Sequence, residues 1–176
     1  MIKLKKITAD DTPLILKMRN ADEVKQNFVI HDDFTEESQL NWLENTVGAG
    51  KAIQYIILFD DVPVGSVYIN NIDHVHAKGE LGIFIGDTTF RGQSIGITAI
   101  NTITCIAFEE LTLHRVYLRV FPENVTAVRS YEKAGFLYEG LLRDTVYTGG
   151  RYRDMIVMSK INKTLSSPRG GGGGGG

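Results

Sequence analysis

The chain has 176 residues, of which 43% are hydrophobic and 23% charged, and its formal net charge is −2. These values are typical of a globular chain with a core of its own, and they exclude general nucleic-acid binding, which needs a basic surface. We expect no signal peptide and no membrane segment, since no run approaches the ~20 apolar residues of a spanning helix. The single cysteine, Cys105, favours a reducing, cytoplasmic location and is expected in the core.

The first half of the chain predicts one strand, two helices and three further strands. One helix begins near Asp10, with Pro13 in its first turn, and another begins at Thr35. Thr35 and Ser38 fall short of a full capping box, which would have an acidic residue or glutamine in place of Ser38. The strands are expected at 2–7, 52–59, 62–69 and 80–86, with polar turns at 60–61 and 70–73.

The second half predicts a long helix, a strand, a short helix and a closing hairpin, at about 93–111, 115–121, 125–134 and 136–161. Gly135 is placed to end the short helix, and Gly149-Gly150 to turn the hairpin. This order predicts one α/β (α+β) domain over residues 1–163, in which helices cover both faces of a mixed, mostly antiparallel seven-stranded sheet. Residues 164–176, which end in a glycine run, are expected to be a disordered or artefactual tail.

The turn that opens the long helix, Arg91-Gly92-Gln93-Ser94-Ile95-Gly96, is suited to binding an anion. The first turn of a helix has unpaired N–H groups and the positive end of the helix dipole. Its glycines let a ligand approach the backbone and allow positive φ. A plain strand-to-helix turn is the alternative, so the meaning of this segment depends on the residues further along the chain.

The short helix near residue 125 carries a second pattern. Asn124 stands at its cap, and Ala127 and Tyr131 follow at offsets of three and seven, so the three side chains lie along one helical stripe. Ala127 is small and leaves room for a ligand beside Tyr131. Taken alone, Tyr131 could equally be a core aromatic residue.

The two patterns together, Arg-Gly-x-x-x-Gly opening a helix and Asn-x-x-Ala-x-x-x-Tyr-x-x-x-Gly-Phe one strand later, resemble the GNAT superfamily of acetyl-CoA-dependent N-acetyltransferases. The order of elements is similar from residue 1 to about 161. Within the superfamily the chain resembles the branch of ribosomal-protein N-terminal and spermidine acetyltransferases, and the stretches 71–76 and 149–154 look most like the spermidine group. The resemblance implies an acyltransferase with acetyl-CoA as cosubstrate, and it suggests a homodimer.

The resemblance also implies a role for each motif residue. Tyr131 would protonate the departing thiolate while the acetyl group passes directly to the amine, without a protein nucleophile. Ser94 stands where the family usually has glycine, and serine resists positive φ, so a different turn or weaker binding of CoA is expected there. The CoA-binding residues would be Arg91, Gly92, Gln93, Ser94, Ile95 and Gly96 for the pyrophosphate, Phe84, Ile85 and Gly86 for pantetheine and the thioester oxygen, and Asn124 with Ala127 for the pantetheine arm.

Three further groups bear on the chemistry. Glu80 is the candidate general base, which would accept a proton through water. The alternative is that Glu80 is only a solvated carboxylate on a strand, without a role in the reaction. His74 and His76 would share one face if they lay on a strand, but two ligands do not make a site, so loop or strand-edge histidines are favoured and no metal is expected. An acidic segment would attract a small cationic amine, such as a polyamine, or a protein N-terminus, unless it is only a solvated helix surface. Its acids are Asp22, Glu23, Asp32, Asp33, Glu36, Glu37 and Glu44.

Two other functions compete with the transferase. A catalytically silent module that binds a CoA ester, with a sensing or scaffolding role, is supported by Ser94 and opposed by Tyr131. A dinucleotide-binding oxidoreductase would need a G-x-G-x-x-G turn and repeated βαβ units, and both are missing from the sequence. The sequence does not name the acceptor: a polyamine, a ribosomal-protein terminus, an amino sugar and a small antimicrobial amine all fit.

Overall fold

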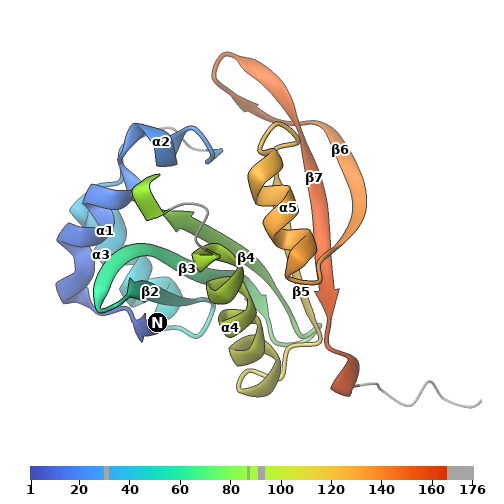
Figure 1. Ribbon diagram of the computed structural model, residues 1–176, viewed down its shortest axis with the longest axis horizontal. Helices are drawn as coiled ribbons and strands as arrows, with labels where there is room; N and C mark the ends of the chain where they lie inside the picture. The colour runs from blue at the N-terminus through green and yellow to red at the C-terminus, as the bar shows by residue number, and fades with distance from the viewer. Residues whose placement is uncertain (30–31, 87, 91–93, 166–176) are drawn as a thin grey trace, which may run out of the picture.

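A central sheet organises the computed structural model, which describes residues 1–29, 32–86, 88–90 and 94–165. The described residues form seven strands in the order β1-β2-β3-β4-β5-β7-β6, and every neighbouring pair is antiparallel except β4 with β5 (Figure 1). The strands are β1 (Ile2–Lys6), β2 (Ile53–Phe59), β3 (Val62–Asp73), β4 (Lys78–Ile85), β5 (Arg115–Val120), β6 (Leu137–Thr148) and β7 (Arg151–Ile161). This confirms the predicted mixed, mostly antiparallel sheet.

Helices cover both faces of this sheet, also as predicted. One face packs against α1 and α2 through a core that includes Ile15, Val24 and Phe84, and the other packs against α4 through a core that includes Ile100 and Ile103. The helices are α1 (Thr12–Arg19), α2 (Asp22–Lys25), α3 (Glu36–Trp42), α4 (Ile95–Glu109) and α5 (Val125–Lys133), with a π-helical turn η2 (Leu43–Val47) after α3 and short 3₁₀ turns η1 (Ala9–Asp11), η3 (Thr88–Phe90) and η4 (Lys163–Leu165). In the described part of the chain no helix is long and apolar enough to cross a membrane.

Both predicted hairpins turn on residue pairs with positive φ. Asp60 and Asp61 have φ of 47° and 67°, and Gly149 and Gly150 have φ of 63° and 77°. Two consecutive positive φ values match the right-handed twist of the flanking strands, and Asp and Gly adopt them more readily than most residues. Both turns are therefore set by local sequence.

Three local predictions are wrong. Thr35 and Ser38 do form a reciprocal cap, at 3.1 Å and 3.0 Å, because the Ser38 hydroxyl replaces the longer acidic side chain. The turn predicted at 70–73 falls after Asp73, whose carboxylate accepts hydrogen bonds from the two amides that open the turn. Cys105 is exposed, since α4 buries Ile103 and Ala107 on the opposite side.

The strands β4 and β5 diverge, and this divergence positions the site. They pair only from Lys78–Glu80 to Arg115–Tyr117, although both strands continue for several residues. Beyond these pairs β5 remains bonded to β7, and β4 remains bonded to β3. Figure 1 shows the two strands separating toward α2 and the upper end of α5. The edge of β4 that faces β5 is therefore left without a partner strand.

The predicted tail lies mostly outside the described residues. Residues 163–165 form the turn η4, in which the Thr164 amide and hydroxyl both donate to Asn162 Oδ1. Residues 166–176 are beyond the described part of the chain. The boundary at residue 163 thus stays a prediction.

Candidate active site

A cleft of about 1160 Å³ opens where β4 and β5 diverge. We call its two sides the α4–α5 wall and the α1–α3 wall. The α4–α5 wall contains the start of α4 with Ser94, Ile95 and Gly96, and the stripe of α5 with Asn124, Ala127 and Tyr131. The α1–α3 wall contains Arg19, Phe28, Phe34, Trp42 and Tyr68.

The floor of the cleft is the open edge of β4. Gly86 N–H donates to Val64 O at 2.8 Å, and in an antiparallel ladder the bonded pairs alternate, so the amide of Phe84 also faces β3. The backbone groups of Ile83 and Ile85 therefore face the cleft. Of the predicted segment 84–86, only Ile85 offers its amide to a ligand. Sequence reasoning missed Ile83, because the sequence does not show which alternate residues of β4 direct their amides toward β3.

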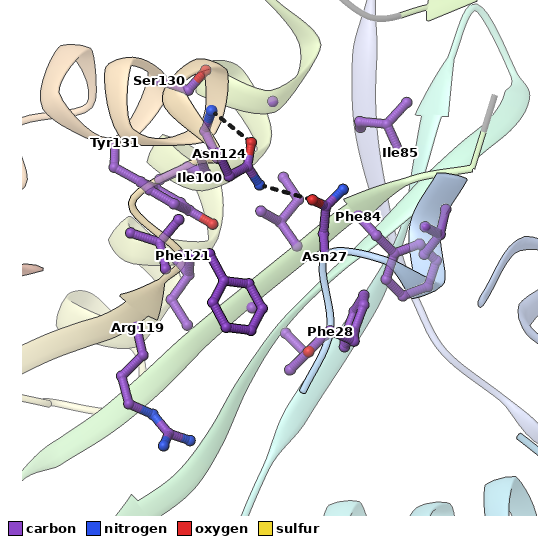
Figure 2. Close-up of a pocket in the computed structure, with 18 of the residues that line it drawn as sticks. Asn27, Phe28, Phe84, Ile85, Ile100, Arg119, Phe121, Asn124, Ser130 and Tyr131 are labelled. Carbon is purple, nitrogen blue, oxygen red and sulfur yellow. Dashed lines mark hydrogen bonds between the residues drawn. The ribbon is translucent and has the colours of Figure 1, made fainter. Parts of the chain in front are cut away.

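Phe84 and Gly86 have packing roles instead. The Phe84 ring meets Phe28 edge-on, with centroids 5.9 Å apart, which ties β4 to the α1–α3 wall (Figure 2). A Cβ at position 86 would lie 2.6 Å from Met18 Cγ, so glycine is required for the close approach of α1. The structure brings Phe84 to the cleft but directs its backbone, like that of Gly86, away from it.

At the start of α4, Ser94 adopts the left-handed conformation that serine resists, with φ 60° and ψ 14°. Ile95 is buried, while a Cβ at Gly96 would meet no atom of the described residues within 4 Å. Thr98 N–H donates to Ser94 O, and the earlier amides of the first turn have no intrahelical acceptor. Arg91, Gly92 and Gln93 lie outside the described residues.

On α5, Asn124, Ala127 and Tyr131 line the cleft together, as their spacing predicts. Asn124 Oδ1 accepts from the Ala127 amide at 3.4 Å, and Asn124 Nδ2 donates to Asn27 Oδ1 at 3.4 Å, which bridges toward the opposite wall (Figure 2). The cap role of Asn124 thus leaves its amide group available to span the cleft.

Tyr131 is 7% exposed and packs against Phe136, and its hydroxyl points into the cleft (Figure 2). Burial, with a smaller contribution from Tyr68, raises the pKa of Tyr131 well above that of a free phenol. The hydroxyl is therefore protonated at neutral pH, which is the state of a hydrogen-bond or proton donor.

Glu80 lines the cleft with both carboxylate oxygens already bonded. Arg119 Nε donates to Oε2 at 2.8 Å, and Asn71 Nδ2 donates to Oε1 at 3.1 Å. The hydrogen bond from Arg119 to Glu80, together with the negative charge of Glu80, raises the pKa of Arg119, although partial burial acts in the opposite direction. Sequence reasoning missed the pairing, although the alternation along β5 does place Arg119 opposite the buried face of Leu118.

The α1–α3 wall is aromatic and contains a buried cation. The guanidinium of Arg19 lies 3.5 Å from the Phe28 ring centre and 4.5 Å from that of Phe34. Trp42 meets the Tyr68 ring edge-on, and burial raises the pKa of Tyr68 to about 12.

No motif indicated this wall, because its members come from separate segments of the chain. The Tyr68 ring also depends on a distant glycine: a Cβ at Gly82 would lie 2.2 Å from a ring carbon of Tyr68. Gly82 stands on β4 and Tyr68 on β3, so the pairing of the two strands sets this contact.

The charges in the cleft are mostly positive. Glu80 pairs with Arg119, and Glu123 pairs with Arg153, whose guanidinium stacks 3.6 Å from the Phe121 ring centre. Among the described residues, the lysines, arginines and carboxylates that line the cleft are Arg19, Arg119, Arg129, Lys133, Arg153, Glu80 and Glu123.

The acidic segment is not part of this lining. All of its carboxylates are exposed, and none of them borders the cleft. One of them, Asp33, forms an ion pair with Lys25. These positions agree with the alternative, a solvated surface, and an acidic lip around the cleft stays a prediction.

The two histidines lie in the turn after β3. His74 Nε2 is 2.9 Å from Gly50 O, and the His76 amide donates to Asp73. Within the described ranges, no three histidine, cysteine or acidic side chains are grouped as a metal site would require. Both histidines thus lie in a turn, which agrees with the favoured interpretation as loop histidines.

Comparison with known proteins defines the class. Residues 2–137 match the family model described as an acetyltransferase (GNAT) domain, and the chain therefore belongs to the GNAT acetyltransferase family. It is 33% identical over 107 residues, 61% of the chain, to the putative ribosomal N-acetyltransferase YdaF of Bacillus subtilis. It is 36% identical over 92 residues, 52% of the chain, to the spermidine N(1)-acetyltransferase of Vibrio cholerae.

These matches cover only part of each relative. The matched segments span 58% and 53% of the lengths of the two relatives, little more than half. In three dimensions the similarity is wider: a crystal structure of the Vibrio cholerae spermidine N-acetyltransferase with CoA and spermine matches 91% of this chain and 95% of its own, with a TM-score of 0.84 at 24% identity. That structural likeness extends the shared fold to β6 and β7, beyond the family match.

Proposed function

We propose that the protein transfers an acetyl group from acetyl-CoA to a primary amine. The observation that carries this proposal is the unpaired edge of β4 facing the protonated hydroxyl of Tyr131 across a cleft. An open strand edge binds an extended chain that carries amides, and a buried phenol can stabilise a developing thiolate. The pantetheine arm of a CoA thioester has both features, since it is extended, carries amides and ends in sulfur.

The α4–α5 wall fits the rest of such a substrate. The free amides at the start of α4, with the positive end of its dipole, suit the pyrophosphate. The backbone of Ile83 and Ile85 suits the pantetheine amides, and the Ile85 amide is placed to bind the thioester oxygen as negative charge develops on it. Asn124 would contact the arm, and Ala127 leaves space for it.

Acetyl-CoA supplies an activated acyl group, and the protein residues manage protons and orientation. The amine nitrogen forms the new C–N bond as the C–S bond breaks, and the Tyr131 hydroxyl donates to the leaving sulfur. Glu80 would accept the ammonium proton through water, with Arg119 and Asn71 fixing the orientation of its carboxylate. No covalent intermediate with the protein is required.

The relatives' names suggest two classes of acceptor, a polyamine and a protein N-terminus, and both enter the test. Free CoA thiol should be followed with spermidine, N-terminal peptides and amino sugars side by side, and acetyl-CoA should raise the melting temperature. The alternative, a silent module that binds a CoA ester, predicts the thermal shift without thiol release on any amine. Absence of both the shift and the release would contradict the proposal.

We also propose that residues 1–163 form the N-acetyltransferase domain and that the protein acts as a homodimer. One solved relative, the Vibrio cholerae spermidine N-acetyltransferase, is described as dodecameric in one structure. In this chain β6 is an edge strand with exposed apolar side chains at Leu137, Tyr138, Leu141 and Leu142. Light scattering should give a dimeric mass, and Leu141→Lys with Leu142→Lys should lower it. A monomeric mass for the unaltered protein would refute this part.

A further inference from the structure

We propose that the acceptor carries a carboxylate as well as its amine, and that Arg19 binds this carboxylate in the cleft. The inference rests on the proposed function and narrows it to amino-acid-like acceptors. Arg19 would act as a specificity-determining residue on the α1–α3 wall.

The starting observation is a buried guanidinium in which one nitrogen, Nη1, has no hydrogen-bond acceptor among the described residues. Arg19 is 4% exposed, and its Nη1 has no hydrogen-bond partner among the described residues. Guanidinium has five N–H donors and cannot lose its charge in a protein, so burying it without acceptors is strongly unfavourable. Its stacking between Phe28 and Phe34 orients the plane but does not give Nη1 an acceptor.

Arg19 lies near the place where the chemistry would occur. It lines the same cleft as Tyr131, and its charge interacts with Tyr68, which in turn interacts with Tyr131. Tyr68, a member of the α1–α3 wall, places its ring against Gly82 on β4, the strand whose edge is open. An acceptor whose amine reaches the thioester would therefore extend toward Arg19.

The chemistry of the ligand follows from the planar fork. Guanidinium binds carboxylate through two parallel N–H···O bonds. A guanidinium that is removed from water needs a negatively charged partner to offset the loss of hydration. Among the described residues, the two carboxylates that line the cleft do not compensate this charge, because Glu80 is paired with Arg119 and Glu123 with Arg153. A polyamine would add positive charge to a cleft that already has an excess of it, whereas an amino acid brings the missing carboxylate.

The alternative is that Arg19 only holds Phe28 and Phe34 in place. That role uses the faces of the guanidinium and leaves Nη1 unsatisfied, so it does not account for the burial of this donor. It also predicts no difference between acceptors with and without a carboxylate, and acceptor pairs therefore separate the two roles.

The experiment uses acceptor pairs that differ only in the carboxylate, on the full-length protein with acetyl-CoA. β-Alanine is compared with ethylamine and L-lysine with cadaverine, while spermidine and a C-terminally amidated peptide represent the other sources of amine. We expect kcat/KM at least about tenfold higher for the carboxylate member of each pair, since a hydrogen bond to a charged group contributes this much. Equal or better turnover of the decarboxylated amines, spermidine or the peptide would overturn the inference while leaving the proposed function intact.

Variants then assign the preference to one residue. Arg19→Gln should reduce the carboxylate preference about 10- to 100-fold, with acetyl-CoA affinity by calorimetry nearly unchanged. Arg19→Lys should restore only part of it, because lysine keeps the charge but not the fork. Arg143→Gln, an exposed change on β6, is the control for lost positive charge and should keep the preference.

The remaining outcomes are also decisive. A folded Arg19→Gln protein that keeps the preference would overturn the assignment, and if that variant does not fold, the acceptor pairs on the unaltered protein decide. Acetyl-CoA binding without turnover of any acceptor would overturn the inference and favour the silent module. Failure to bind acetyl-CoA at all would instead refute the proposed function.

Discussion

The two walls of the cleft are built in different ways. The α4–α5 wall uses backbone groups and two short segments, 94–97 and 124–131, in which each side chain is placed by helical spacing. The α1–α3 wall uses side chains from several separate segments, including Arg19, Trp42 and Tyr68, which meet only through packing. The α4–α5 wall, with its backbone groups, suits the binding of acetyl-CoA. The α1–α3 wall, with its particular side chains, suits the selection of an acceptor.

The largest expected effect tests the chemical group of the α4–α5 wall. Tyr131→Phe removes one hydroxyl from a buried ring, so kcat should fall roughly 100-fold while acetyl-CoA affinity changes little. Because burial raises the pKa of Tyr131, its own titration should produce no loss of rate at or below pH 10. Stopped assays of thiol release, with calorimetry for binding, would measure both, and an unchanged kcat would remove Tyr131 from the mechanism.

A smaller effect is expected at Glu80, which stands on β4 and lines the cleft between the two walls. Glu80→Gln keeps an acceptor for Asn71 but cannot take a proton, so kcat should fall about tenfold. Arg119→Gln leaves the carboxylate in place and should cost less. Equal losses in the two variants would mean that the ion pair, rather than proton transfer, is what the reaction needs.

Outside both walls, Glu139 tests stability without touching the cleft. It accepts from Arg115 Nη1 and Nη2 at 2.5 Å and 2.7 Å and from Ser159 Oγ at 2.5 Å, and these bonds lower its pKa from 4.5 to about 2. A lowered folded-state pKa adds stability that is present above pH 4.5 and is lost as the pH falls from 4.5 toward 2.

Since the Glu139 side chain is 38% exposed, solvent screening limits the expected loss in Glu139→Gln to about 1 kcal/mol at pH 7. Chemical denaturation at pH 7 and near pH 2 would measure it. The unaltered and variant proteins should differ at the higher pH and converge at the lower one, with kcat unaffected throughout. A constant difference at both pH values would contradict the linkage.

The smallest effect concerns the backbone of the α4–α5 wall. Ser94→Gly relieves a left-handed conformation but increases the freedom of the unfolded chain, so the net gain should be at most about 0.5 kcal/mol. Since the turn is already left-handed without a substrate, acetyl-CoA affinity should stay nearly constant. Ser94→Val, which is β-branched, should instead destabilise by about 1 kcal/mol or more. Markedly tighter binding by the glycine variant would show that the strain acts on binding.

Local patterns predicted the elements well where a single segment decides them. The turns at Asp60-Asp61 and Gly149-Gly150 and the alternation of Val116, Leu118 and Val120 needed no knowledge of distant residues. Cys105 was misplaced because its apolar character was weighed without its helical position, which it shares with the exposed Thr98, Asn101 and Thr102. Gly86 was assigned to binding because the sequence hides its contact with Met18.

The sequence by itself determined the helical stripe of Asn124, Ala127 and Tyr131, the turn that opens α4, and hence the family, because helical spacing and positive φ are local properties. Only the tertiary structure decided which amides of β4 face the cleft, that Glu80 is held by Arg119, and that Nη1 of Arg19 is buried without an acceptor from the described part of the chain. These features depend on strand phase and on contacts between segments far apart in the chain. The common part of the site could therefore be predicted from spacing, and the part that selects the acceptor could not.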